Sequence, residues 1–314
     1  MNWHGARRSW ETQEVTMDSI TTQSALSVPL TDRRPAGRLR RYLAYPAVLL
    51  ANGVLVAWAL VVAAPLEAVT SLGLLATLAF LFLLESTMPY EREWHPSARE
   101  SIRDFVYFGL NGAMDALVKL GVAFAVAAIA AWDNGLPFAI ALPASILVAD
   151  FGGYWFHRWG HHGWLWKVHG VHHTPEKVNV WNNNTIHFLN SFYSGVAKTL
   201  PLALLGFDPA VIVIAAYAST IQSYAVHANI DVDLGRLGYL IMGPAHHRLH
   251  HSTVVEEAGN YASVFTLWDI AFGTFVYGAG RSPAKVGVAE PKSFPSPDSV
   301  IRNQLHPFFD QGQA

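Results

Sequence analysis

Long uninterrupted apolar runs restrict the fold of this chain more than any other feature of its sequence. The first extends from Tyr42 to Ala64, the second from Val69 to Leu84 and the third from Phe105 to Trp132, and a fourth begins near Pro137. Each is close to the ~20 residues that a helix needs to cross the hydrocarbon core of a bilayer. Only 14% of the residues are charged, against about 25% in ordinary globular domains. The sequence therefore predicts an all-α, integral membrane helical bundle.

Two further apolar segments, 188–205 and 210–226, predict an additional helical hairpin beyond the four transmembrane helices. The hairpin returns the chain to the face it left, whether it enters the bilayer or lies at its surface, and the sequence does not choose between the two. We expect four regions in total: a disordered polar and basic tail (1–41), the N-terminal transmembrane helices (42–135), a histidine-rich domain (136–280) and a loose C-terminal tail (281–314).

The placement of arginines predicts how the chain is oriented in the membrane. Connections on one side are arginine-rich, whereas those around Glu67 and at Asp133–Asn134 carry no Lys or Arg. The positive-inside rule makes the arginine-rich side cytoplasmic. Four crossings then return the chain to that side just before His157, which places a histidine-rich cap in the cytoplasm. The arginines concerned are Arg33, Arg34, Arg38, Arg40 and Arg41 before the first run, and Arg92, Arg99 and Arg103 between the second and third.

Histidines are concentrated in one part of the chain. Twelve of the 15 lie between His157 and His251, and several follow helical spacing. His157 and His161 form an HxxxH motif, and two HxxHH motifs follow: His169, His172 and His173, then His247, His250 and His251. Residues at i, i+3 and i+4 project from the same side of a helix. Each motif therefore predicts a small array of imidazoles that point in one direction.

Such arrays favour a metal site. Neutral imidazole is a good ligand for iron, zinc, copper or nickel. The chain has no cysteine, so thiolate zinc sites, iron–sulfur clusters and disulfides are excluded. Eight motif histidines exceed what one ion can use, which indicates two ions, or one ion with bystanders. We expect His157, His161, His169, His172 and His173 to form one half of a two-metal site and His247, His250 and His251 the other.

Other polar residues are candidates for the same site. His187 and His227 each stand where an apolar segment meets a polar one, which makes them candidate additional ligands. Asp150 continues the stripe of Tyr154 and His157 along one helix face, so we expect it to orient an imidazole N–H. A role as a metal ligand, or as a helix end that faces interfacial water, is the alternative. The aromatic residues near this stripe either line a lipid entrance or anchor the protein at headgroup level: Tyr154, Trp155, Trp164, Trp166 and Trp181.

The motifs HRWGH, HGVHH and HHRLHH, after four apolar spans, resemble those of the fatty acid hydroxylase/sterol desaturase superfamily of membrane di-iron oxygenases. The resemblance covers roughly Leu136 to Gly278 and includes Asn260–Tyr261, Trp268–Asp269 and Phe272–Gly273–Thr274. It implies two iron ions held by the histidines, molecular oxygen as co-substrate, and hydroxylation or desaturation of a lipid C–H bond. It also implies a separate electron-transfer protein, of the ferredoxin or cytochrome b5 type, as the external electron donor.

A second class of function is a membrane metal carrier or sensor without redox catalysis. Transporters usually place polar ligands near the bilayer midplane, whereas these histidines follow the ends of apolar runs, which favours the enzyme. A net charge of −2 gives no indication of a nucleic-acid partner. The sequence leaves open the lipid substrate, hydroxylation or desaturation, and iron or zinc, since a His-only site suits both metals.

Overall fold

In the computed structural model, residues 28–29, 37–129, 133–278 and 280–309 are described. The predicted disordered tail lies largely outside these ranges. Six long helices follow one another within them: α2 (Arg38–Val61), α3 (Leu66–Thr87), α4 (Ala98–Ile129), α5 (Phe138–Gly160), α7 (Phe188–Leu204) and α8 (Pro209–His227). The shorter helices are α6 (Gly163–His173), α9 (Pro244–His250), α10 (Leu267–Ala271) and α11 (Val300–Leu305).

The remaining regular elements are short. They are the 3-10 helices η1 (Arg92–Trp94), η2 (Asn182–Asn184), η3 (Gly235–Tyr239), η4 (Val255–Glu257), η5 (Pro291–Ser293) and η6 (His306–Phe308), and the strands β1 (Val28–Pro29) and β2 (Arg281–Ser282). β1 pairs antiparallel with β2, so this part of the expected N-terminal tail is ordered. The architecture is an all-α bundle, as the apolar runs predict.

Five of the six long helices are long and apolar enough to cross a membrane: α2 from Leu39, α3, the Ala98–Phe124 part of α4, α5 and α8. α7 has only 17 residues and contains Lys198 and Pro201, yet it packs along α4 and α5 inside the bundle. The prediction of four transmembrane helices followed by a helical hairpin is confirmed. The protein is a multi-pass membrane protein.

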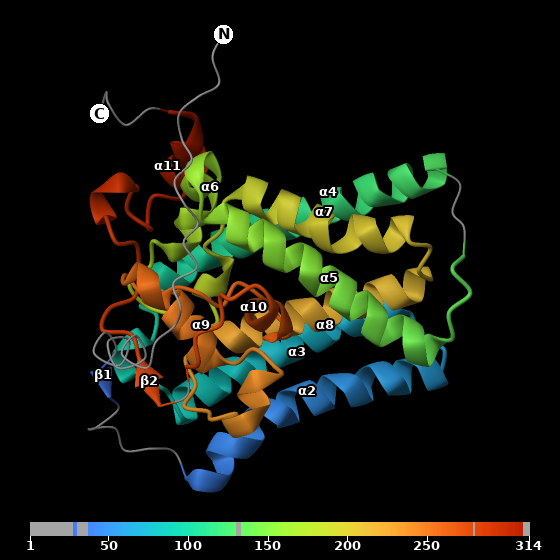
Figure 1. Cartoon of the computed structure of the whole chain (residues 1–314), viewed down its shortest axis with the longest axis horizontal. Coiled ribbons are helices and arrows are strands. Elements are labelled where there is room, and N and C mark those ends of the chain that lie inside the picture. Colours follow the sequence, from blue (N-terminus) through green and yellow to red (C-terminus); the bar gives the residue numbers. More distant parts are fainter. Residues whose placement is uncertain (1–27, 30–36, 130–132, 279, 310–314) are drawn as a thin grey trace.

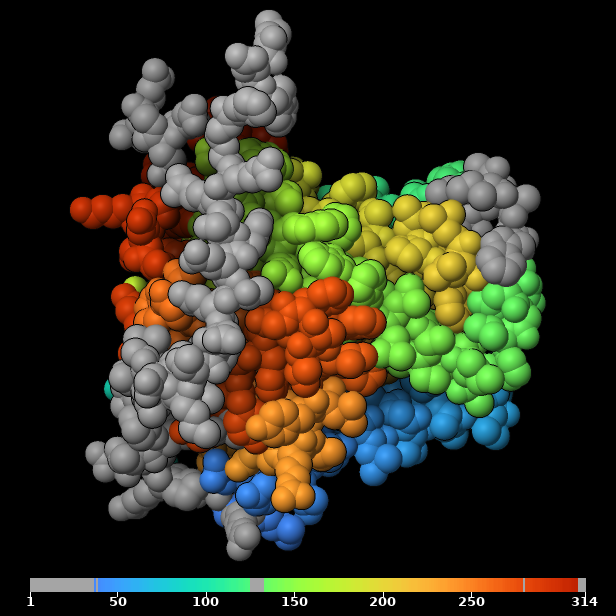
Figure 2. Space-filling view, in the orientation of Figure 1, coloured from blue at the N-terminus to red at the C-terminus, as the bar shows by residue number. Residues whose placement is uncertain are grey.

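All six long helices run side by side, and the chain reverses at each end of the bundle (Figure 1). One end, on the left of Figure 1, carries α6, α9, α11 and both strands; we call it the histidine end. Figure 2 shows the orange and red segments that follow α8 spread over this end and over one flank of the bundle. Arg40, Arg99 and Arg103 lie near the starts of α2 and α4, at the histidine end.

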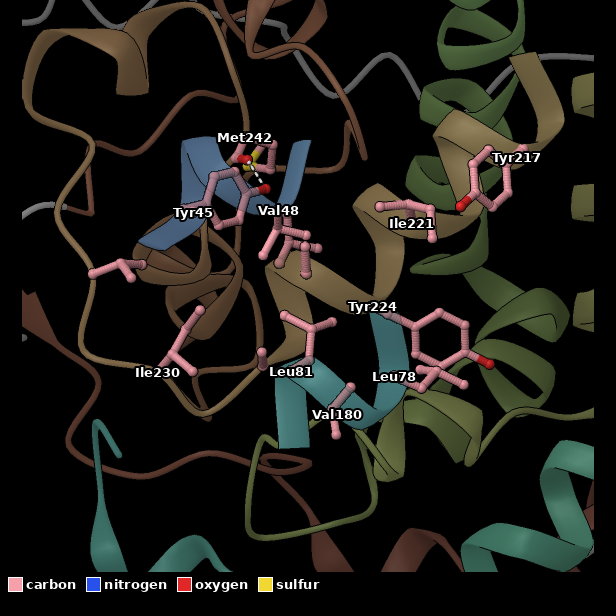
Figure 3. Close-up of a cluster of buried hydrophobic side chains, with 14 of the residues drawn as sticks. Tyr45, Val48, Leu78, Leu81, Val180, Tyr217, Ile221, Tyr224, Ile230 and Met242 are labelled. Atoms are coloured by element: carbon pink, nitrogen blue, oxygen red, sulfur yellow. Dashed lines mark hydrogen bonds between the residues drawn. The ribbon is translucent and has the colours of Figure 1, made fainter. Parts of the chain in front are cut away.

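The core of the bundle lies between α2, α3 and α8. Its buried side chains include Tyr45, Leu81 and Ile221 (Figure 3). The Tyr45 hydroxyl donates a hydrogen bond to the Met242 carbonyl at 2.9 Å, which ties the first span to the polypeptide near α9. Gly73 permits close contact between α3 and α8, because a Cβ there would lie 2.3 Å from the Tyr217 hydroxyl. Asp115 and Lys119, four residues apart on α4, form an ion pair at 2.8 Å.

The segment 281–309, expected to be loose, is instead packed against the histidine end. The Phe294 ring covers Gly170 of α6, where a Cβ would lie 2.2 Å from the ring. Asp298 accepts a hydrogen bond from Arg103 of α4 at 3.1 Å, and the Arg103 side chain is buried beside Asp104. A composition rich in proline and polar residues predicted a tail, but these few buried side chains fix it in place.

Candidate metal centre

Nine histidines converge at the histidine end and form two groups, and within each group one ring nitrogen per residue lies within 4.8 Å of the others. All eight motif histidines belong to them, together with His227 from the end of α8. The first group, called group A below, contains His157, His161, His169, His173 and His250. The second, group B, contains His172, His227, His247 and His251.

The two groups do not follow the predicted halves, because each HxxHH motif contributes to both. In α6, His169 and His173 belong to group A, whereas His172 belongs to group B. Successive residues of a helix are rotated by about 100° around the helix axis. The rings at i+3 and i+4 therefore point in different directions, although both lie close to position i. The second HxxHH motif shows the reverse assignment. His247 and His251 belong to group B, whereas His250, three residues after His247, belongs to group A.

Backbone carbonyls orient several of the rings. A carbonyl can only accept, so the Nδ1 facing it carries the hydrogen, and the Nε2 of the neutral ring keeps its lone pair. Second-shell acceptors of this kind usually fix metal-ligating histidines in proteins. Three Nδ1–carbonyl contacts are present: His157 to Tyr261 at 2.5 Å, His227 to Asn179 at 2.7 Å and His250 to Gly259 at 2.7 Å.

His169 is held by a side-chain amide in the same way. The Asn190 oxygen accepts from His169 Nδ1 at 2.9 Å and from the Tyr193 hydroxyl. The Nε2 atoms of His169 and His173 then lie 3.2 Å apart, and α9 repeats this spacing between His247 and His251. Two nitrogens at this separation can both reach one ion at bond lengths of about 2.1 Å.

Several inward-facing nitrogens are buried and have no hydrogen-bond partner among the described residues. A buried polar atom without a hydrogen-bond partner usually destabilises the folded protein by about 1–3 kcal/mol, so a cluster of such atoms requires an explanation. A metal ion that accepts their lone pairs supplies one. The atoms are the Nε2 of His157, His161, His227 and His250 and the Nδ1 of His172. The residues present therefore fit two metal ions.

Burial also keeps these rings neutral. It lowers the pKa of His169 to about 4 and that of His250 to about 3. Burial first, and then repulsion from neighbouring imidazoles, lowers the pKa of five more well below the usual value: His161, His172, His173, His247 and His251. Neutral imidazole is the form that binds metals, so at neutral pH the groups are ready as ligands.

Asp150 does not contact an imidazole, which corrects the expectation for this residue. Its carboxylate accepts the backbone N–H groups of Ser263, Val264 and Phe265 at 3.1, 2.9 and 2.9 Å. It therefore fixes the segment that begins at Tyr261, whose carbonyl orients His157. The acid is buried at 2% exposure because three backbone donors replace its solvation.

Asp269 holds the same segment from the other side, and its role was not predicted from the sequence. Its carboxylate accepts the backbone N–H groups of Tyr261 and Ala262 and the Thr274 hydroxyl. The Tyr261 ring contacts His157, His161 and His250 of group A. Trp268–Asp269 was noted only as part of the family resemblance, and helical spacing gives no indication that this acid reaches Tyr261.

Of the twelve histidines between His157 and His251, three lie outside both groups. His187, a candidate ligand, uses both ring nitrogens elsewhere: Nδ1 accepts from the Leu189 backbone and caps α7, and Nε2 donates to the Gln304 carbonyl. His162 is exposed before α6. His246 is buried, and its ring stacks on that of Phe275. Of the two solitary candidates, therefore, only His227 joins the site.

Comparison with known proteins agrees with this geometry. A family model described as fatty acid hydroxylase matches residues 142–274, a range that includes all nine histidines. The chain is 30% identical over 228 residues to an ornithine lipid hydroxylase from Rhizobium tropici, with 68% of this chain and 69% of that protein covered. The chain belongs to the fatty acid hydroxylase family. This confirms the resemblance found in its sequence motifs.

Other members of the fatty acid hydroxylase family match over shorter shares of their length. The chain is 30% identical over 239 residues to alkylglycerol monooxygenase from Danio rerio, which covers 72% of this chain and 48% of that enzyme. It is 32% identical over 135 residues to methylsterol monooxygenase 1 from Rattus norvegicus, which covers 41% of this chain and 44% of that enzyme. No solved structure matches the chain.

Proposed function

We propose that this protein is an O2-dependent membrane lipid hydroxylase with a histidine-bound di-iron centre. The observation that carries the proposal is the pair of buried histidine groups at one end of a membrane bundle. Related family members are named as hydroxylases or monooxygenases of ornithine lipid, alkylglycerol and methylsterol. Their names favour hydroxylation over desaturation and a lipid as substrate.

Groups A and B would hold one iron ion each. When bound, the two ions would supply the redox chemistry that activates molecular oxygen toward an unactivated C–H bond, which no acid–base side chain can attack. A His-only site also suits zinc, so we assign iron from the redox chemistry that the reaction requires. Group A offers five imidazoles and group B four.

The protein itself would position the ligands and exclude water. Anchored Nδ1–H groups, as in His157 and His250, fix the tautomer, so each Nε2 lone pair faces inward before any ion binds. Burial of His169, His172, His173, His247, His250 and His251 below 8% exposure keeps solvent from the site. Preorganised, dry surroundings strengthen electrostatic interactions and prevent side reactions.

The orientation and the electron source also belong to the proposal. The arginines near the starts of α2 and α4 lie at the histidine end, whereas the connections at 62–65, 133–137 and 205–208 at the other end contain no Lys or Arg. By the positive-inside rule the histidine end would be cytoplasmic. A soluble electron-transfer protein, of the ferredoxin or cytochrome b5 type, would then reach it from the cytoplasm.

The placement of the histidines disfavours a metal carrier. A transport site near the bilayer midplane would lie about halfway along the spans, but His157 and His227 occupy the last turn of α5 and of α8. Group B is also closed in by protein, since all four of its members are buried, and three of the five members of group A are buried as well.

The proposal is tested by oxygen uptake of the iron-loaded protein in vesicles of host lipids with a ferredoxin and its reductase. We expect lipid-dependent oxygen uptake for the wild type and none for His172→Ala, which removes one ligand of group B. A His162→Ala control, outside both groups, should match the wild type. Equal uptake by His172→Ala and the wild type would refute the proposed function.

A further inference from the structure

An apolar surface that is not part of the metal centre covers one flank of the bundle. It consists of two segments, the end of η3 with the residues after it and the short helix α10 with Phe272. We call this surface the ledge. Its large apolar side chains are between 38% and 56% exposed: Leu237, Tyr239, Leu240, Leu267, Ile270 and Phe272. Contiguous apolar patches of this kind usually mark a protein or membrane contact.

No charged group is exposed within the ledge. Among residues 237–242 and 265–273 the only charged side chain is Asp269, which is fully buried in its contacts with Tyr261 and Ala262. Arg236 lies directly before the first segment and is exposed. A charge-free apolar surface with a basic residue at its margin is typical of an element at a lipid interface.

α10 lies beside a transmembrane helix rather than beyond its end. The Trp268 ring contacts Phe151 of α5 at 4.8 Å between centroids, and Phe272 contacts Trp155 at 4.9 Å. Phe151 is 13 residues after the start of α5 at Phe138, or roughly 20 Å along the helix axis, which is within the ~30 Å of the hydrocarbon core. Figure 1 shows α10 in front of α5 and α8.

The η3 segment is fixed to the first turns of α2. The Asp233 N–H donates to the Arg41 carbonyl, and the Met242 carbonyl accepts from Tyr45. The two segments of the ledge are joined to each other, since the Thr266 N–H donates to the Leu240 carbonyl at 3.2 Å. The ledge is thus a single unit attached to α2 and α5, and its exposed face is continuous with half-exposed Phe151 of a span.

We propose that the ledge is inserted into the bilayer leaflet on the histidine side and that its occupant is lipid. Continuity with the lipid-facing surface of α5 and the absence of exposed charge carry this assignment. Figure 2 shows the orange and red surface meeting the green surface of α5 on the same face of the molecule. The ledge then extends the membrane contact of the protein beyond its transmembrane helices.

The ledge is also one contact away from the metal centre. Asp269 of α10 holds Tyr261, and the Tyr261 ring contacts three histidines of group A. Under the proposed function, on which this point rests, lipid at α10 would lie next to the wall of the site. The insertion of the ledge itself does not depend on any catalytic activity.

The absence of cysteine allows a direct test with single nitroxide labels in vesicle-reconstituted full-length protein. Labels would be placed by Ile270→Cys and Leu240→Cys in the ledge. Leu72→Cys, 67% exposed on the span α3, is the lipid-facing control, and Val255→Cys, 75% exposed beside Glu256, is the water-facing control. Accessibility to oxygen and to a water-soluble nickel chelate would then be measured.

We expect the two ledge labels to be accessible to oxygen and protected from the nickel chelate, as the Leu72 label is, and the Val255 label to show the opposite. Metal content equal to that of the wild type would show that each labelled protein is folded. Nickel accessibility at Ile270 equal to that at Val255 would overturn the proposal. Dipolar broadening between labels at Ile270 would also overturn it, because a second copy of the chain would then cover the ledge. No turnover is needed, so this result is independent of the proposed function.

Discussion

Asp150→Asn tests whether a buried acid that touches no histidine controls the metal centre. The Asp150 Oδ1 accepts the N–H groups of Ser263 and Val264, and Oδ2 accepts that of Phe265. Asparagine has nearly the same shape but only one acceptor oxygen. If that oxygen keeps the two bonds of Oδ1, the new NH2 group faces the Phe265 N–H, donor against donor.

The expected loss of stability of Asp150→Asn follows from these hydrogen bonds. One hydrogen bond to a charged group, about 1.5–3 kcal/mol, is lost, and a buried N–H left unmet costs about 1–3 kcal/mol. We therefore expect Asp150→Asn to destabilise the protein by roughly 3–5 kcal/mol. Because the segment from Tyr261 to Phe265 then shifts, the Tyr261 carbonyl no longer fixes His157, and loss of such outer support typically lowers metal affinity about 10–100-fold.

The assay combines metal content with unfolding. Iron per protein would be measured by elemental analysis after equilibration in a metal buffer, and stability by thermal unfolding in detergent. Asp208→Asn is the matched control, since Asp208 is exposed and caps α8 by accepting the Ala210 backbone N–H, and asparagine caps helices as well as aspartate does. We expect the control to match the wild type in both measurements.

Two outcomes would exclude a role of Asp150 in positioning the metal ligands. Equal metal affinity of Asp150→Asn and Asp208→Asn would show that the Tyr261 segment does not position His157. A loss of stability without any loss of iron would show that Asp150 serves the fold alone.

Three further predictions concern single side chains. His227→Ala should reduce bound iron from two ions to about one, because it removes one of the four imidazoles of group B and none of group A; unchanged iron in elemental analysis would exclude His227 as a ligand. His187→Asn should leave iron content unchanged, since both ring nitrogens of His187 are used outside the groups and asparagine also caps helices well; loss of iron would contradict this. Glu85→Gln should alter the free energy of unfolding by less than about 1 kcal/mol, whereas Glu85→Ala should lower it by about 1–3 kcal/mol or more. The reason is that Glu85 Oε1 accepts the N–H groups of both Val180 and Asn229, while Oε2 has no partner among the described residues. Equal melting curves of the two variants would contradict this prediction.

The bundle could be predicted from the sequence because each part of the prediction is local. Apolar runs of about 20 residues have few alternatives to a membrane helix, and α2, α3, α4 and α5 follow the predicted runs closely. The eight motif histidines were likewise found from i, i+3 and i+4 spacing within single helices. Their convergence required only that the hairpin α7–α8 return to the histidine end.

The division of the nine histidines between groups A and B could not be predicted, because it depends on how α6 and α9 face each other. Spacing within α6 places His172 and His173 near one another, but only the position of α9 and α8 decides that His172 joins His227. The supporting residues are distant in sequence for the same reason. Asp150 and Asp269 reach Tyr261 and its neighbours through loops whose course no periodicity encodes, and a span acid such as Glu85 meets Val180 only after folding.

If the protein hydroxylates a lipid with molecular oxygen, the oxygen atom of the lipid product derives from O2. The wild type and His172→Ala would be expressed in the same host under 18-O-labelled molecular oxygen, and the total lipids compared by mass spectrometry. We expect the wild type to add one labelled oxygen atom to a lipid and the variant to add none. Identical lipid profiles, or a new product whose oxygen derives from water, would contradict it.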